Sequence, residues 1–427
     1  MFYIIENNEQ LEDFKNIDYG KVFIEPIFYN DNVHPSLNDI SLLYIKPLNK
    51  DKGYIICLDH NESLSLNKTD VSKLLHSFSE IYVRDRKKFI YFFPLTNLID
   101  ISFGIPEYTE PSTTAYDVFY SRFSSLENLN TIIPLVKHYE KCELIFDKIK
   151  DYCVKTENSK FTNKLTTTFF SIERNGLKID KPIFDKFYEI NDEAFSISDN
   201  TVYSRYNLYT TTGRPSNSFN GINFAALAKD SGCREAFIPE NDYFIEIDIS
   251  AYHPTLAGQL FGFDFKDETP YEYFAREAGI ELSEAKILMF RQLYGGVYKE
   301  YKHIEYFKLI QEYIDDLWKS FKQHGFIECC RSGHRFTKEL KDLNPNKLFN
   351  YLLQNLETST NVVILWEIFK LLKSKHSNIV LYTYDSILID YSKEDNILED
   401  IKQVFTNFGL KIKLTKGKNY GTMMPLQ

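Results

Sequence analysis

The sequence predicts a mixed α/β protein built in two parts, and three observations carry this prediction. The chain has 427 residues, of which 43% are hydrophobic and 26% charged, enough for two or three packed domains. Residues 21–101 hold short apolar runs such as "KVFIEPIF" and "GYIICLD", separated by Asn, Asp, Gly and Pro, which is typical of strands. Residues 124–155 then repeat apolar side chains at three- and four-residue steps, which indicates helix. We therefore expect a first α/β domain over residues 1–158.

The rest of the chain again mixes helices and strands. A helix is expected to stop at Asn175-Gly176, and a short extended piece and a second helix follow it. The polar stretch "TTTGRPSNSFNGIN" predicts a loop, and "DYFIEIDISAYHP" predicts a strand that ends near Asp248. Residues 271–322 and 346–375 are mostly helical. The stretch "NIVLYTYDSILIDY" predicts a hairpin with Asp385 at its turn, before a helix at "NILEDIKQVFTNFG" and a strand at "LKIKL".

Charge and cysteine content limit the partners and the compartment. The chain has 50 basic and 60 acidic residues and thus a net charge of −10, so any contact with a polyanion needs a local basic surface. The 6 cysteines form no CxxC pair, which favours reduced thiols in the cytoplasm and argues against a zinc site. The start "MFYIIENNEQ" has no signal-peptide pattern, and no apolar run of membrane-spanning length occurs. We expect a soluble, cytoplasmic protein without a membrane partner.

Asp248 and Asp385 are the first candidates for chemistry. Each lies at the end or turn of a strongly apolar strand. If the two strands are neighbours, two carboxylates meet, and they repel each other unless a cation lies between them. Hard oxygen ligands suit Mg²⁺, and two such ions could promote phosphoryl transfer. The alternative is that both are ordinary turn aspartates, and spacing alone favours that alternative.

Two helical segments carry further candidates. In "AKILMFRQLYGG", Lys286, Phe290 and Tyr294 lie four residues apart, so that one side of a helix presents a cation and two rings. A lysine can bind a triphosphate, and rings can pack on a base and sugar, although such a stripe is more often core. In "NYLLQ", Asn350 and Gln354 share a helix face, where amides could donate to minor-groove acceptors.

Taken in order, these segments resemble the family A DNA polymerases. "ERNGLKID" is similar to the start of their polymerase region, "TTTGRPSNSFNGIN" to their TGRLSS…NLQN segment, and "REAFIP" to their RxAF piece. "IDISAYHPTLAG" resembles the first catalytic motif, and "KILMFRQLYGG" matches K-x3-F-x3-YG. "GFIECCRSGHRF", "NYLLQ", "TYDS" and "TKGKNYG" resemble the later motifs in the correct order. The resemblance extends from residue 173 to the C-terminus.

This resemblance implies a right-hand polymerase fold (palm, fingers and a reduced thumb) after an RNase H-like, exonuclease-type α/β domain. The expected polymerase domain covers residues 159–427, with the thumb at about 159–205, the palm at about 206–265 and 324–427, and the fingers at about 266–323. The implied activity is template-directed addition of dNTPs to the 3′ end of a DNA primer. The reduced thumb predicts weak grip on the duplex, because phosphate contacts supply most non-specific affinity. A processivity factor or other replisome protein is an expected partner, and a phage or similar element an expected source.

The resemblance also assigns site residues. Asp248 and Asp385, with the carbonyl of Ile249, would hold two Mg²⁺ ions, with Mn²⁺ as the alternative metal. Lys286, Phe290 and Tyr294 would bind the incoming nucleotide. The residues expected at the primer–template are Arg214, Gly295, Asn350, Gln354 and Tyr384.

The chain departs from the family at four positions. His253 stands where a glutamate excludes ribonucleotides, so we expect His253 to be the steric gate that selects dNTPs. Tyr384 and Ser386 replace a histidine and a glutamate beside Asp385. Leu282 replaces a nucleotide-binding arginine, and Arg291 is the expected substitute.

These departures keep alternatives open. Asp-Ser at the turn is also found in single-subunit RNA polymerases, so an RNA polymerase or primase-like enzyme is one alternative, and an inactive nucleic-acid-binding remnant is another. Family B polymerases share "DxxSLYPS"-like features but lack the TGR segment. In the N-terminal part, "FIEPIF" supplies Glu25 without the Asp-x-Glu that the family's 3′–5′ exonuclease needs. We therefore expect a degenerate domain without proofreading.

Overall fold

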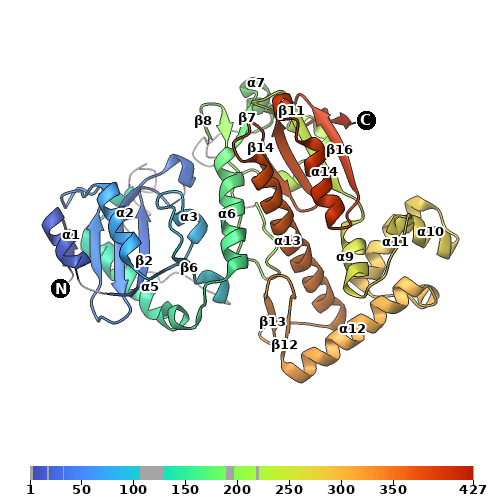
Figure 1. The fold of residues 1–427 in the computed structure, drawn as a ribbon, viewed down its shortest axis with the longest axis horizontal. Coiled ribbons are helices and arrows are strands. Elements are labelled where there is room, and N and C mark those ends of the chain that lie inside the picture. Colours follow the sequence, from blue (N-terminus) through green and yellow to red (C-terminus); the bar gives the residue numbers. More distant parts are fainter. Residues whose placement is uncertain are drawn as a thin grey trace. The chain divides into compact units, whose positions relative to one another are not determined.

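The computed structural model describes residues 3–16, 19–31, 33–105, 129–188, 197–217 and 221–426. The chain divides into two compact units (Figure 1). The first consists of Met1–Arg174 and Ile190–Asp199, and the second consists of Asn175–Glu189 and Asn200–Gln427.

The first unit is an α/β sandwich around one mixed sheet. Its described elements are β1 (Tyr3–Ile5), α1 (Asn8–Lys15), β2 (Lys21–Phe28), β3 (Ile40–Pro47), β4 (Tyr54–Cys57), α2 (Lys68–Ser77), β5 (Glu80–Val83), α3 (Arg86–Phe89), β6 (Leu98–Asp100), α5 (Leu135–Lys155), α6 (Lys160–Asn175) and β8 (Ile197–Ser198). The sheet has the order β1-β4-β3-β2-β5-β6. Strands β2, β3 and β4 form an antiparallel meander, and β5 and β6 continue the sheet parallel to β2. This mixed sheet with helices on both faces confirms the predicted α/β class of this unit.

Both faces of this sheet are buried, which explains the nearly continuous apolar runs of its central strands. Val22 and Ile24 of β2 pack with residues of α1, α2 and α3 on one face. Phe23 and Ile27 of the same strand pack with residues of α5 on the other. Each inner strand therefore contributes alternate side chains to two cores.

Two helices of the first unit differ from the prediction in their bounds or grouping. Helix α5 begins at Leu135, after Pro134 at its N-cap, rather than at residue 124, and residues 124–128 lie outside the described residues. Proline provides no backbone N–H and restricts the residue before it, which accounts for the late start. Helix α6 ends at Asn175 as predicted, before Gly176 with φ +64°. Most of α6 belongs to the first unit, although the sequence placed the domain boundary at residue 158.

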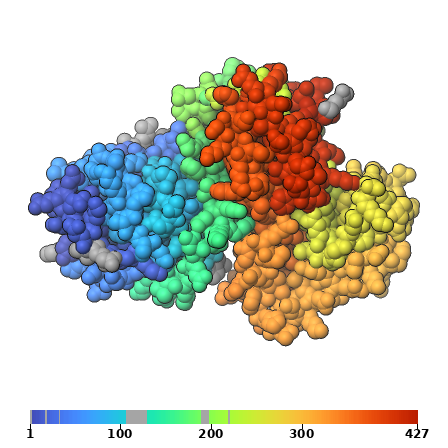
Figure 2. Space-filling model, in the orientation of Figure 1, coloured from blue at the N-terminus to red at the C-terminus, as the bar shows by residue number. Residues whose placement is uncertain are grey.

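The second unit contains the segments with the resemblance. Its described elements are β7 (Leu177–Ile179), α7 (Lys181–Phe187), β9 (Thr201–Val202), β10 (Phe237–Ile238), β11 (Tyr243–Ile249), α9 (Tyr252–Leu260), α10 (Pro270–Ala278), α11 (Leu282–Gly295), α12 (Glu305–His324), β12 (Phe326–Glu328), β13 (Arg335–Thr337), α13 (Pro345–Leu372), β14 (Asn378–Thr383), β15 (Ser386–Tyr391), α14 (Leu398–Asn407), β16 (Ile412–Gly417) and β17 (Met424–Pro425). An antiparallel sheet runs β14-β15-β11-β16-β17. In Figure 2, the C-terminal segment with α14 and the last strands of this sheet (orange-red to red) forms one lobe, and α10, α11 and α12 (yellow to orange) form another.

Helix α13 is the central element of the second unit. It contacts α9, α11, α12 and α14, and its middle turns are buried nearly all round. A helix that is surrounded in this way shows no single apolar face. In the part of the chain that the structure describes, no helix combines the length and the apolar character needed to cross a membrane.

Candidate active site

The structure brings Asp248 and Asp385 together at one end of the antiparallel sheet. Asp248 is the penultimate residue of β11 and pairs across the strands with Ser386, the first residue of β15. The backbone N–H of Ile249 donates to the carbonyl oxygen of Asp385 at 2.8 Å. Asp385 directly precedes Ser386 in the chain, and the charge of Asp248 acts on the Asp385 carboxyl, so the two carboxyls share one small region.

Asp385 occupies a strained hairpin turn. The loop between β14 and β15 consists of Tyr384 and Asp385, and Tyr384 has φ +64°. A positive φ at the first loop residue is typical of a type II′ turn, in which glycine is preferred. Asn361 of α13 donates to the Tyr384 carbonyl at 2.8 Å, and the Arg214 guanidinium lies 3.7 Å from the centre of the Tyr384 ring. These contacts hold the left-handed tyrosine and thereby the position of Asp385.

Both carboxyls are held in an environment that disfavours their charge. Burial raises the pKa of Asp385, and the neighbouring Asp248 raises it further. Burial also raises the pKa of Asp248, with a contribution from Glu246, while Lys413 and Lys229 act in the opposite direction. A cation between the aspartates would relieve this repulsion.

The donor set around the aspartates consists of oxygen atoms. Within the described residues, no group of three or more His, Cys, Asp and Glu side chains that could hold a metal is found. The candidate ligands at this hairpin are the two aspartate carboxylates and backbone carbonyl oxygens. Two carboxylates with raised pKa values and a carbonyl such as that of Ile249 suit Mg²⁺, which usually keeps several waters and binds one or two carboxylates. The residues present therefore fit a magnesium site.

Helix α11 presents the predicted stripe to this region. Lys286, Phe290 and Tyr294 are all exposed on one side of the helix, and the Phe290 and Tyr294 rings stack at 5.9 Å. Tyr271 of α10 connects the stripe to the aspartates: the Lys286 ammonium lies 6.0 Å from its ring centre, and Phe290 lies 6.3 Å away. Burial raises the pKa of Tyr271 to about 12, and both Asp385 and Asp248 contribute. The stripe is thus an open surface beside the carboxylates rather than core.

Two other predicted site residues of α11, Gly295 and Arg291, lie outside the stripe. Gly295 accepts a hydrogen bond from the Asn346 amide at 3.2 Å at the helix end, and a side chain on the next residue, Gly296, would meet that amide at 2.7 Å. Arg291 is exposed but follows Phe290 by one residue, about 100° around the helix. The structure therefore does not place Arg291 on the stripe, and its role as a substitute for the arginine missing at Leu282 stays a prediction.

His253 lies in a buried polar network under the stripe. Its Nε2 atom contacts a carboxylate oxygen of Glu357, and its Nδ1 atom lies 2.6 Å from the Tyr294 hydroxyl. Glu357 also pairs with Arg214 at 3.1 Å. His253 is only 7% exposed and Glu357 1%. The network connects α9, α11, α13 and the loop that carries Arg214.

The predicted primer–template residues are placed differently from one another. Asn350 uses one amide hydrogen to donate to the Tyr294 carbonyl at 3.0 Å, so this side chain joins α13 to α11 instead of presenting its whole amide outward. Gln354 is half-buried, and its side chain makes no hydrogen bond within the described residues. Arg214 follows Gly213, which has a φ of +68°. A Cβ atom on Gly213 would lie only 2.7 Å from the Asn355 amide nitrogen, so this position has no room for a side chain. Arg214 and Tyr384 lie against each other at the hairpin.

Sequence reasoning missed three residues of this site: Tyr271, Glu357 and Asn361. Asn361 bridges the Tyr384 carbonyl, the Tyr382 hydroxyl (2.9 Å) and the Tyr252 hydroxyl (2.7 Å). The available signal was polar residues at buried positions of "NLETSTN", in a helix otherwise rich in apolar side chains. Buried polar groups need partners, and they can mark a network.

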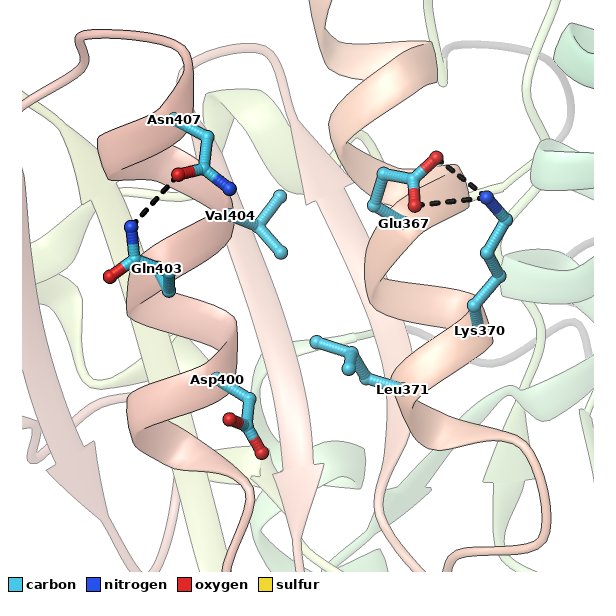
Figure 3. Close-up of a pocket in the computed structure, with 7 residues that line it drawn as sticks. All are labelled: Glu367, Lys370, Leu371, Asp400, Gln403, Val404 and Asn407. Carbon is cyan, nitrogen blue, oxygen red and sulfur yellow. Dashed lines mark hydrogen bonds and ion pairs between the residues drawn. The ribbon is translucent and has the colours of Figure 1, made fainter.

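A separate surface pocket of about 360 Å³ lies between α13 and α14 (Figure 3). Glu367 and Lys370 form an ion pair on one wall, and Gln403 donates to Asn407 at 2.8 Å on the other. None of the predicted site residues lines this pocket. It is not part of the aspartate site.

Comparisons with known proteins find similarity to DNA polymerase I in sequence and in structure. No family model matches the chain. DNA polymerase I of Caldicellulosiruptor bescii is 24% identical over 260 residues, which is 48% of this chain and 30% of that protein, so the chain spans less than a third of that relative. The polymerase domain of Pol1 from M. smegmatis, solved in complex with a DNA primer–template and a dNTP, superposes with a TM-score of 0.67 at 12% identity, over 99% of both chains. The chain therefore has the fold of that polymerase domain.

Proposed function

We propose that this protein is a template-directed DNA polymerase of the DNA polymerase I type, which transfers deoxynucleotides from dNTPs to a primer 3′ end. The observation that carries the proposal is the position of Asp248 beside the hairpin turn of Asp385 at the sheet end, next to the exposed Lys286 stripe. The fold shared with the Pol1 polymerase domain and the partial similarity to a DNA polymerase I support it.

The proposed reaction is nucleotidyl transfer. The primer 3′-hydroxyl releases its proton to solvent as its oxygen attacks the α-phosphate of the dNTP. The new phosphodiester bond forms while the bond to the β-phosphate breaks, and pyrophosphate leaves with the electrons of that bond. Asp248, Asp385 and the carbonyl of Ile249 would hold two Mg²⁺ ions, which when bound activate the hydroxyl and stabilise the leaving oxygen. Lys286 binds the triphosphate as a point charge, and the rings of Phe290 and Tyr294 position the base and sugar.

Primer extension tests this proposal. Wild-type protein is expected to extend a primed template with dNTPs and Mg²⁺, and Asp385→Asn to lose activity by about a hundredfold or more, because the charge that holds the metal is removed. Asp316→Asn makes the same chemical change at an exposed position of α12 and serves as the control. Full activity of Asp385→Asn would contradict the metal assignment, and absence of extension by the wild type would contradict the function.

We also propose that the first unit has no proofreading activity. Glu25, the nearest equivalent of a catalytic exonuclease carboxylate, forms a bidentate pair with Arg84: the Arg84 Nε donates to one oxygen at 2.8 Å and an Nη contacts the other. A carboxylate engaged in this way is a poor metal ligand. Incubation of the pure protein with a mismatched primer and Mg²⁺ should leave the primer length unchanged. Shortening of the primer that Glu25→Gln abolishes would refute this.

A further inference from the structure

We infer that Glu357, a buried residue of α13, sets the sugar selectivity of the proposed active site by fixing the ring of His253. This inference rests on the proposed function, because it concerns the ribose of the incoming nucleotide. Glu357 touches no nucleotide itself. It is a positioning residue that acts through His253.

Glu357 is held by two partners at once. One carboxylate oxygen pairs with Arg214, at 3.1 Å from an Nη atom and 3.2 Å from Nε, and the other contacts Nε2 of His253. The side chain is only 1% exposed. A buried carboxylate is strongly unfavourable without such partners, so this charge is expected to hold both side chains firmly.

The His253 ring has both nitrogens occupied. Since Nε2 faces a carboxylate, it carries a proton and donates, while Nδ1 lies 2.6 Å from the Tyr294 hydroxyl. The His253 and Tyr294 rings meet edge to face at 5.8 Å. The imidazole can therefore offer only its C–H edge to a ligand. A ribose 2′-hydroxyl placed against that edge would lose water without gaining a hydrogen-bond partner, which adds to any steric exclusion.

The position of Tyr294 locates this ring near the sugar. Tyr294 follows Lys286 by eight residues on the same side of α11, about 12 Å along the helix axis. A triphosphate held between Lys286 and the two aspartates then leaves the sugar beside the last turn of α11. Burial raises the pKa of Tyr294, and the charges of Glu357 and Asp385 contribute, which agrees with a place between the network and the aspartates.

The experiment compares sugar selectivity in primer extension opposite one templating base. The measured quantity is the ratio of kcat/KM for a dNTP to kcat/KM for the matching rNTP. This ratio is independent of the fraction of folded enzyme, so a partly unfolded variant remains informative. The variants are Glu357→Gln, which keeps the side-chain shape, His253→Ala, and the double variant. Glu367→Gln is the matched control, since Glu367 lies on the same helix but pairs with Lys370 at the surface (Figure 3).

We expect wild type to prefer the dNTP and Glu357→Gln to lower the ratio by about tenfold or more, mainly through a lower KM for the rNTP, because a released ring can turn a nitrogen to the 2′-hydroxyl. Glu367→Gln should keep the wild-type ratio. The double variant should have the ratio of His253→Ala, because Glu357 acts through His253.

Three results would overturn the inference, and they are distinguishable. If wild type does not extend primers, the proposed function fails and the inference with it. If wild type extends primers but Glu357→Gln keeps the wild-type ratio, only the inference fails. If Glu357→Gln changes the ratio equally with and without His253, the path through His253 is wrong.

Discussion

Substitution of Asp385 by Asn should stabilise the metal-free protein at neutral pH while it removes the response to Mg²⁺. The pKa values of Asp385 and Asp248 are both raised, by burial and by neighbouring carboxylates. For a carboxyl whose pKa is higher in the folded than in the unfolded state, folding favours the protonated form. Stability is therefore lost as the pH rises from the unfolded-state pKa through the folded-state pKa, and above that range the ionised pair is a constant cost.

Coulomb's law sets the scale of this cost. Two unit charges about 5 Å apart repel by roughly 1 kcal/mol in water and several times more at lower effective dielectric. Surrounding protein atoms desolvate the Asp385 carboxyl in part, which raises its pKa, but the residue keeps a large solvent-exposed surface, so the lower value applies after screening. For a unit of this size, about 1 kcal/mol corresponds to a rise of about 2–4 °C in Tm. The gain should shrink as the pH approaches about 4, where the wild-type carboxyls become protonated.

Thermal unfolding at pH 7.5, with EDTA or with graded Mg²⁺, tests this. Wild type should gain about 1.4 kcal/mol at a Mg²⁺ concentration ten times Kd, whereas Asp385→Asn should gain little. Asp316→Asn on α12 should behave as wild type in both conditions. A lower Tm for Asp385→Asn than for wild type in EDTA, or an unchanged Mg²⁺ response, would refute the idea that the two carboxylates form one repulsive, metal-binding pair.

Three further changes have defined outcomes. Asn361→Ala should destabilise the protein by about 1–3 kcal/mol in chemical unfolding and reduce primer extension, since the Tyr384 turn loses its support; normal extension would contradict this. Lys286→Ala should raise the KM for dNTPs by about tenfold or more in steady-state kinetics, and an unchanged KM would exclude its triphosphate role. Glu25→Gln should destabilise the protein by about 1–3 kcal/mol, because the charged bidentate contact with Arg84 is lost, and wild-type stability would disprove the contribution of this pair.

Local patterns of apolar and polar residues in the sequence predict many of the helices and strands. Apolar runs that end in Asp248 and Asp385 predicted strands, because a buried strand leaves few places for a carboxylate other than its end. The spacing of Lys286, Phe290 and Tyr294 predicted a common helix side, because the helical repeat is close to four residues. These are properties of neighbouring residues, so the sequence by itself determined them. The same holds for the end of α6 before Gly176, where the backbone takes a left-handed conformation.

The tertiary structure alone decided which distant side chains meet. Glu357 contacts His253 across 104 positions of the chain and Arg214 across 143, and neither distance leaves a local pattern. Asn361 reaches the hairpin only because the fold brings the middle of α13 to Tyr382 and Tyr384, and its hydrogen bond supports the left-handed Tyr384. Periodicity tells which side of an element is buried, since it depends on near neighbours. The partner on that side depends on how whole elements pack. That packing brings Asp248, Asp385 and Glu357 into one candidate site, although no sequence pattern singled out Glu357.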